Sequence, residues 1–173
     1  MRTYRLGLSM MVVFGLLESP AAAQDANGVE ITPYVALGSN GSSPLGVAVV
    51  FPVTSKLSLE TEVGYRRGEG RIHALSSSAS LLFALPRIRR AIPYLAAGAG
   101  LSQYGTPVVS PNGYPIGTQP RIAVTVNAGG GLKARIDDKV ALRTDARWFK
   151  SFGKQGSEQF RVAQGISFDA GKR

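Results

Sequence analysis

Few residues of this sequence have the side-chain types and the spacing that catalysis requires. The first candidates are two carboxylates. Glu60 and Glu62 lie in the stretch "LSLETEVGY", in which apolar and polar residues alternate. On an extended strand, residues two apart share a face and lie about 7 Å from each other, within the range that glycoside hydrolases use for an acid–base pair. Such a pair must flank a substrate cleft, so this chemistry requires an open face.

His73 is the only histidine of the chain. A histidine activates a serine only within hydrogen-bonding reach. On an extended strand, Ser77 is the first serine on the His73 face, about 13 Å away, and Ser76 points to the opposite face. A catalytic pair would therefore need a serine from a neighbouring strand, and we expect His73 to be an ordinary residue at the rim of the fold.

Cofactor sites also lack their sequence signatures. The string "AGGG", residues 128–131, does not match G-x-G-x-x-G, and no helix follows it, so a phosphate-binding loop is unsupported. The chain has no cysteine, which excludes disulfides and thiolate metal sites. We expect no catalytic residue, no metal and no cofactor.

The first 23 residues have the pattern of a signal peptide. The cationic start "MRTYR" precedes the apolar run "LGLSMMVVFGLL", and "ESPAAAQ" supplies a cleavage site between Ala23 and Gln24. The run is shorter than the about 20 apolar residues of a membrane-spanning helix, which disfavours the alternative of an N-terminal anchor. We expect an exported protein with a signal peptide, 1–23, and one domain, 24–173.

After residue 24 the hydrophobic pattern has a period of two, and no window shows a convincing helical period. Clusters of Gly, Pro, Ser and Asn separate the alternating stretches, as expected for strands joined by turns. Eight such runs are predicted, at 29–38, 45–51, 56–65, 72–85, 92–104, 121–136, 140–149 and 159–168.

Alternation fits both a soluble β-protein with an apolar interior and a transmembrane barrel with a polar interior. The connections favour the barrel: "SNGSSP", "RRGEGR", 105–120 and "KSFGKQGSE" are on average longer than the intervening "PVTSK", "PRIRRA" and "DDK". Short turns on one side and long loops on the other are typical of transmembrane barrels, and several runs reach their strand length of about 10 residues. The sequence predicts an all-β, eight-stranded antiparallel up-and-down transmembrane β-barrel. A soluble lipocalin-like binder with an apolar interior is an alternative.

In such a barrel the charged faces of the strands would fill the lumen, which eight strands leave just wide enough for side chains. Glu60 and Glu62 lie as far beyond one short turn as Arg143 and Asp145 lie beyond another, so these residues are expected at matching depth. Because an unpaired buried charge costs several kcal/mol, they should be ion-paired. The predicted lumen charge network comprises Glu60, Glu62, Lys133, Arg135, Arg143, Asp145 and Arg147.

The signal peptide, the eight runs and the closing "FRVAQGISF" resemble the small outer-membrane β-barrel proteins of Gram-negative bacteria, the OmpA-like/OmpX-like group, over roughly residues 24–169. The resemblance implies the fold and a location in the outer membrane after export through the inner membrane. Because no active-site motif accompanies it, we expect a structural or cell-surface interaction role without catalysis. Similar barrels that modify lipid A use a histidine and a serine, so an enzyme using His73 is an alternative. Such proteins usually end on an aromatic residue, whereas here Phe168 is followed by "DAGKR".

The formal charge of +9 predicts contact with anionic surfaces, and the resemblance makes lipopolysaccharide a better candidate than nucleic acid. Arginine is well shaped for phosphate, although solvated loops are an alternative. The predicted lipopolysaccharide contacts, in the outer connections, are Arg66, Arg67, Arg71, Lys150 and Lys154.

Two further features concern the predicted outer side. Trp148, Tyr65 and Tyr104 fall near outer strand ends, where an aromatic girdle is expected. The segment 104–120, with four prolines and three glycines, is predicted to lack regular structure and to form a loop that could bind a surface ligand.

Overall fold

The computed structural model describes residues 28–39, 41–67, 73–113, 115–153 and 156–170. The predicted signal peptide, 1–23, lies outside this range, as do Arg71 and Lys154. The backbone of Arg67 and His73 is described, but their side chains are not.

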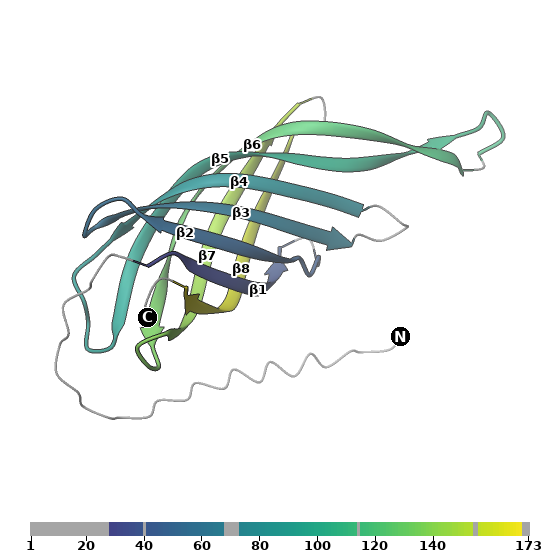
Figure 1. Ribbon diagram of the computed structural model, residues 1–173. Helices are drawn as coiled ribbons and strands as arrows, with labels where there is room; N and C mark the ends of the chain where they lie inside the picture. Colours follow the sequence, from purple (N-terminus) through teal and green to yellow (C-terminus); the bar gives the residue numbers. More distant parts are fainter. Residues whose placement is uncertain (1–27, 40, 68–72, 114, 154–155, 171–173) are drawn as a thin grey trace, which may run out of the picture.

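Eight strands form one closed sheet (Figure 1). Each strand pairs antiparallel with the next, and β1 pairs with β8 to close the barrel. The predicted fold class is therefore confirmed. The strands are β1 (Glu30–Gly38), β2 (Leu45–Pro52), β3 (Leu57–Arg67), β4 (His73–Ala84), β5 (Ala91–Val109), β6 (Pro115–Arg135), β7 (Val140–Phe152) and β8 (Ser157–Asp169). No helix in the described part of the chain is long and apolar enough to cross a membrane.

The barrel has two distinct ends. The start of β1, the end of β8 and the turns 53–56, 85–90 and 136–139 lie at one end, called here the terminal end. The connections after β1, β3, β5 and β7 lie at the other, called the hairpin end. The predicted difference in connection length is largely absent, because the additional residues of the hairpin end belong to β5 and β6.

The prediction that residues 104–120 lack regular structure is wrong. Strands β5 and β6 continue past the rest of the barrel as a two-stranded ribbon (Figure 1), with pairs from Gly105↔Pro120 to Val109↔Pro115. In an antiparallel pair of strands, hydrogen-bonded and non-hydrogen-bonded residue pairs alternate. The pairs that contain Pro107 and Pro120 are two steps apart, so both can be of the non-hydrogen-bonded kind, in which proline is tolerated. Gly113, with φ 82°, supplies the left-handed conformation of the turn.

The apolar side chains face outward. Leu59, Val124 and Leu142 are 37%, 53% and 39% exposed, whereas Glu60 is 0% and Arg143 5% exposed. Since neighbouring residues of a strand point to opposite faces, one alternation produces both surfaces. This arrangement contradicts the apolar interior of the lipocalin-like alternative.

Glycine creates the space for large side chains inside the narrow lumen. Gly46 is the register partner of Tyr34, and Gly131 is the register partner of Tyr94. A Cβ atom at either glycine would meet the hydroxyl group of the partner tyrosine. Both tyrosines are buried and reach toward the charged residues at the centre.

Candidate functional site

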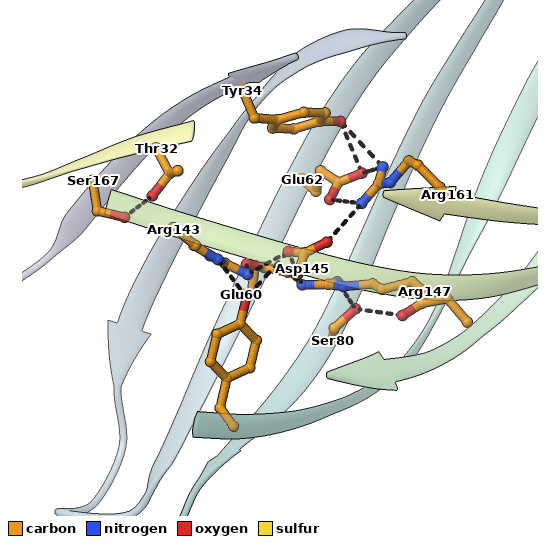
Figure 2. A network of polar contacts seen from close by, with 12 residues as sticks. Thr32, Tyr34, Glu60, Glu62, Ser80, Arg143, Asp145, Arg147, Arg161 and Ser167 are labelled. Carbon is orange, nitrogen blue, oxygen red and sulfur yellow. Dashed lines mark hydrogen bonds and ion pairs between the residues drawn. The ribbon is translucent and has the colours of Figure 1, made fainter. Parts of the chain in front are cut away.

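The centre of the lumen holds three carboxylates and three guanidinium groups, so its formal charges balance. Strand β3 supplies the two glutamates, β7 supplies the aspartate and two arginines at alternate positions, and β8 supplies the third arginine. None of the six residues is more than 6% exposed. This group, called here the lumen cluster, comprises Glu60, Glu62, Arg143, Asp145, Arg147 and Arg161 (Figure 2).

Glu60 connects opposite walls of the barrel. Its Oε2 lies 2.5 Å from Arg143 Nη2, and its Oε1 lies 2.7 Å from Arg147 Nη2. Strands β3 and β7 are not neighbours in the sheet, so these ion pairs cross the lumen. Because Glu60 and Arg147 have no exposed surface, each depends on the other for compensation of its buried charge.

Asp145 completes the β7 part of the cluster. Its Oδ2 lies 3.1 Å from Arg143 Nη2 and 3.2 Å from Arg147 Nη2. The Tyr94 hydroxyl donates to the same oxygen at 3.2 Å and accepts from Arg143 Nε at 2.8 Å. The Tyr94 hydroxyl therefore bridges the Asp145 carboxylate and the Arg143 guanidinium. The same guanidinium lies 5.0 Å from the centre of the Tyr94 ring.

Glu62 and Arg161 form the most complete ion pair. Arg161 Nη1 and Nη2 donate to the two Glu62 oxygens at 2.6 and 2.9 Å, a forked geometry that is stronger than a single contact. Tyr34 donates to Glu62 Oε1 at 3.0 Å. The Arg161 guanidinium lies 5.1 Å from the ring centre of Tyr34 and 4.7 Å from that of Phe149.

Arg161, Tyr34 and Tyr94 are absent from the residues predicted for the lumen network. The alternation of β8 does place Arg161 on the face opposite Phe160 and Val162. Its depth, however, follows from pairing with Arg147 of β7. This register between strands is not visible in the local pattern.

The structure brings together Glu60, Glu62, Arg143, Asp145 and Arg147, and it places the other two predicted members elsewhere. Lys133 forms an ion pair with Glu30 of β1. Arg135 lies beyond it, among the residues that line the mouth of the lumen at the terminal end.

At the hairpin end, the predicted lipopolysaccharide contacts divide. Arg66 is half-buried and its Nη1 donates to Gln159 Oε1 at 2.9 Å, which directs it toward the lumen. Lys150 is on the surface, 3.1 Å from Glu158 and 5.9 Å from the centre of the Trp148 ring. Arg71, Lys154 and the Arg67 side chain lie outside the described residues.

The outward aromatic residues form two bands. Tyr65 and Trp148 are 39% and 38% exposed near the hairpin end, as predicted. Tyr104 differs, because its register partner is the buried Ala74, which puts it on the inward face of β5. Other exposed aromatics near the hairpin end are Phe152 and Phe160, and those near the terminal end are Phe51, Phe83 and Phe168.

The chemistry available to the lumen cluster is charge pairing. Both glutamates are held by arginines and shielded from solvent, so they do not flank a cleft as an acid–base pair would. Within the described residues, no group of three or more His, Cys, Asp or Glu side chains is placed to hold a metal ion.

Comparison with known proteins gives similarity in structure but not in sequence. No family model and no curated protein sequence matches the chain. The N-terminal β-barrel domain of Pseudomonas aeruginosa OprF is similar with a TM-score of 0.62 and 16% identity, over 82% of this chain and 96% of that one. Neisserial surface protein A has a TM-score of 0.62 and 11% identity, over 82% and 94%. The outer membrane enzyme PagL has a TM-score of 0.52 and 14% identity, over 81% and 99%. The chain thus shares the fold of the eight-stranded outer-membrane barrels.

Proposed function

We propose that this protein is a non-catalytic outer-membrane β-barrel with a structural or cell-surface interaction role. The observation that carries the proposal is the outward apolar wall between two aromatic bands. On β8, Phe160 and Phe168 are eight residue steps apart, which corresponds to roughly 20 Å along the barrel axis at about 3.3 Å per residue and a tilt of about 40°. This span approaches the about 25 Å apolar band of outer-membrane barrels.

The orientation follows from the asymmetry of the two ends. Outer-membrane barrels place short turns in the periplasm and longer segments outside the cell. The ribbon of β5 and β6 is the longest projection, so the hairpin end would face outward, and the start of β1 and the end of β8 would face the periplasm.

The lumen cluster supports a structural role over that of an open pore. Its six side chains, from three strands, are shielded from solvent and link opposite walls. An eight-stranded barrel has room for such side chains but not for a water channel beside them. The cluster would hold the cross-section rigid while its balanced charges avoid a net buried charge.

Two kinds of surface contact are proposed at the hairpin end. Lys150 and Lys154, at the end of β7 and after it, and Arg67 and Arg71, at the end of β3 and after it, would attract lipopolysaccharide phosphates. The segment 104–120 contains no charged residue and would bind an uncharged surface ligand.

Deleting residues 105–120 should abolish ligand binding without reducing lipopolysaccharide association. Loss of both would contradict this division.

A lipid A-modifying enzyme is the second candidate, because the barrel fold is shared with an outer membrane enzyme. The register partner of His73 on β3 is Arg67, not a serine, which favours the non-catalytic role. Mass spectrometry of lipid A from cells that produce the wild type or His73→Ala tests this candidate. We expect identical profiles, and a modification present only with the wild type would establish the enzyme.

Gel migration of the membrane fraction tests the location and the closed barrel together. The protein should sediment with outer membranes, and the unheated sample should migrate faster than the boiled sample because the closed barrel resists detergent unfolding. A soluble periplasmic protein without a heat-dependent shift would contradict the proposal.

A further inference from the structure

Each turn at the terminal end combines an exposed aliphatic residue with cations. Val53, Ile88 and Ile136 are 59%, 65% and 63% exposed. The basic residues of the three turns are Lys56, Arg87, Arg89, Arg90 and Lys139. In a globular protein such aliphatic residues would face water. In a bilayer they would lie just beyond the aromatic band of the terminal end, at the depth of the lipid headgroups.

The turn between β4 and β5 is the most cationic of the three and has an unusual backbone. Ile88 and Ala91 exchange two backbone hydrogen bonds of 2.9 and 3.0 Å around Arg89 and Arg90. Arg89 has φ 55° and is the only described non-glycine residue with a positive φ. The common two-residue hairpins use glycine, asparagine or aspartate for this conformation. An arginine here is unfavourable for the backbone, which points to a role for its side chain.

The side chains of Arg89 and Arg90 have no carboxylate partner among the described residues, unlike the arginines of the lumen cluster. In the turn between β6 and β7, by contrast, Asp137 is present and its Oδ1 accepts the backbone N–H groups of Lys139 and Val140, each at 2.7 Å. The turn between β4 and β5 contains no acidic residue at all. The positive charges of Arg89 and Arg90 are therefore available to an external anion.

The wall next to this turn suits an acyl chain. Phe83 and Leu95 are register partners, 47% and 54% exposed, and lie directly below the turn. Farther along, Ala79, Ala97 and Ala99 face outward. These small side chains project less from the barrel wall than the larger residues near the turn. The outward apolar residues of β4 and β5 thus form a continuous strip that ends at Arg89 and Arg90.

We propose that the turn 85–90 binds the phosphate headgroup of an anionic phospholipid in the leaflet at the terminal end, with the acyl chains along β4 and β5. The inference rests on the proposed membrane location. Arg89 and Arg90 would contact the phosphate, and Ile88, Phe83 and Leu95 the hydrocarbon. The occupant is a lipid rather than a free anion, because the cations and the exposed apolar wall are continuous.

The test compares lipids retained by the full barrel after extraction from bilayers of equimolar phosphatidylglycerol and phosphatidylcholine. Native mass spectrometry should show the wild type enriched in phosphatidylglycerol. The double variant Arg89→Gln and Arg90→Gln should reduce this enrichment by roughly fivefold for each cation removed. The matched variant Arg89→Lys and Arg90→Lys should retain most of it.

Two controls separate this site from general electrostatics and from misfolding. The double variant Arg121→Gln and Lys150→Gln removes the same charge at the hairpin end and should lower the enrichment less. All variants should keep the heat-dependent gel shift, so failure of this site is distinguishable from failure of the barrel assignment. An equal loss in both glutamine variants, or no enrichment in the wild type, would overturn the proposal.

Discussion

At the residue scale, Glu60 makes closer ion pairs with Arg143 and Arg147, at 2.5 and 2.7 Å, than Asp145 makes with the same two arginines. In Glu60→Gln, Arg143 and Arg147 would share only Asp145. We expect the free energy of unfolding to fall by about 3–5 kcal/mol, as when one partner of a buried ion pair is removed. Urea titration of the barrel in vesicles, followed by gel mobility, measures this change.

The matched control is Glu158→Gln, which removes a carboxylate from an exposed pair. Glu158 and Lys150 have side chains 58% and 43% exposed, so solvent screens their attraction. This variant should cost less than about 1 kcal/mol. An equal loss of unfolding free energy in both variants would show that the burial of Glu60 does not increase its contribution to stability.

The forked pair of Glu62 and Arg161 should couple strongly. Glu62→Gln and Arg161→Gln each leave a buried charge, whereas the double variant removes both charges together. We expect the double variant to be less destabilised than the sum of the single variants by about 1–3 kcal/mol. Additive losses in the same urea titration would mean that the two groups do not interact in the folded barrel.

At the scale of the element, two of the glycines of strand β6 are expected to respond in opposite ways to substitution by alanine. A Cβ atom at Gly131 would meet the Tyr94 hydroxyl and the backbone oxygen of Thr144, whereas at Gly117 nothing lies within 4 Å. Gly131→Ala should therefore lower stability by about 1–3 kcal/mol through overpacking, and Gly117→Ala should leave it nearly unchanged. Similar urea midpoints for the two variants would disagree with the packing of Tyr94 across β6.

The ribbon of β5 and β6 should be dispensable for the fold. Beyond Tyr104, β5 pairs only with β6, and β6 has no β7 partner before Val124. Replacing residues 105–120 with Asn-Gly would join the strands by a favoured two-residue turn. The shortened protein should keep its heat-dependent gel shift. Its loss would indicate that the ribbon contributes to barrel closure.

The sequence pattern is sufficient for the number of strands and for the two faces of each, but not for the ribbon of β5 and β6 or for features that depend on pairing between strands. Alternation is local, so the eight runs and the face shared by Glu60 and Glu62 could be read directly. The prediction that this face points inward rests mainly on the connection lengths, and the difference between these lengths is largely absent from the structure. The depth of Arg161 and the inward face of Tyr104 depend on pairing with neighbouring strands. Pro107 and Pro120 are typical of loops when the sequence is considered alone. The pairing of β5 with β6 shows that both prolines lie at positions where a backbone N–H would not be used for a hydrogen bond between these strands.

At the scale of the whole molecule, the account depends on which surface meets lipid. The chain has no cysteine, so single cysteines report one position each. Val124 and Thr125 are neighbours on β6, yet Val124 is 53% exposed and Thr125 only 5%. The same strand segment thus supplies both a test position and its control.

The most direct measurement labels Val124→Cys and Thr125→Cys with a fluorophore and adds phospholipids that carry a quencher on their acyl chains. We predict strong quenching at position 124 and weak quenching at position 125 in the reconstituted barrel. The reverse pattern, or equal quenching by lipid and by a water-soluble quencher at position 124, would contradict a barrel whose apolar wall faces the membrane.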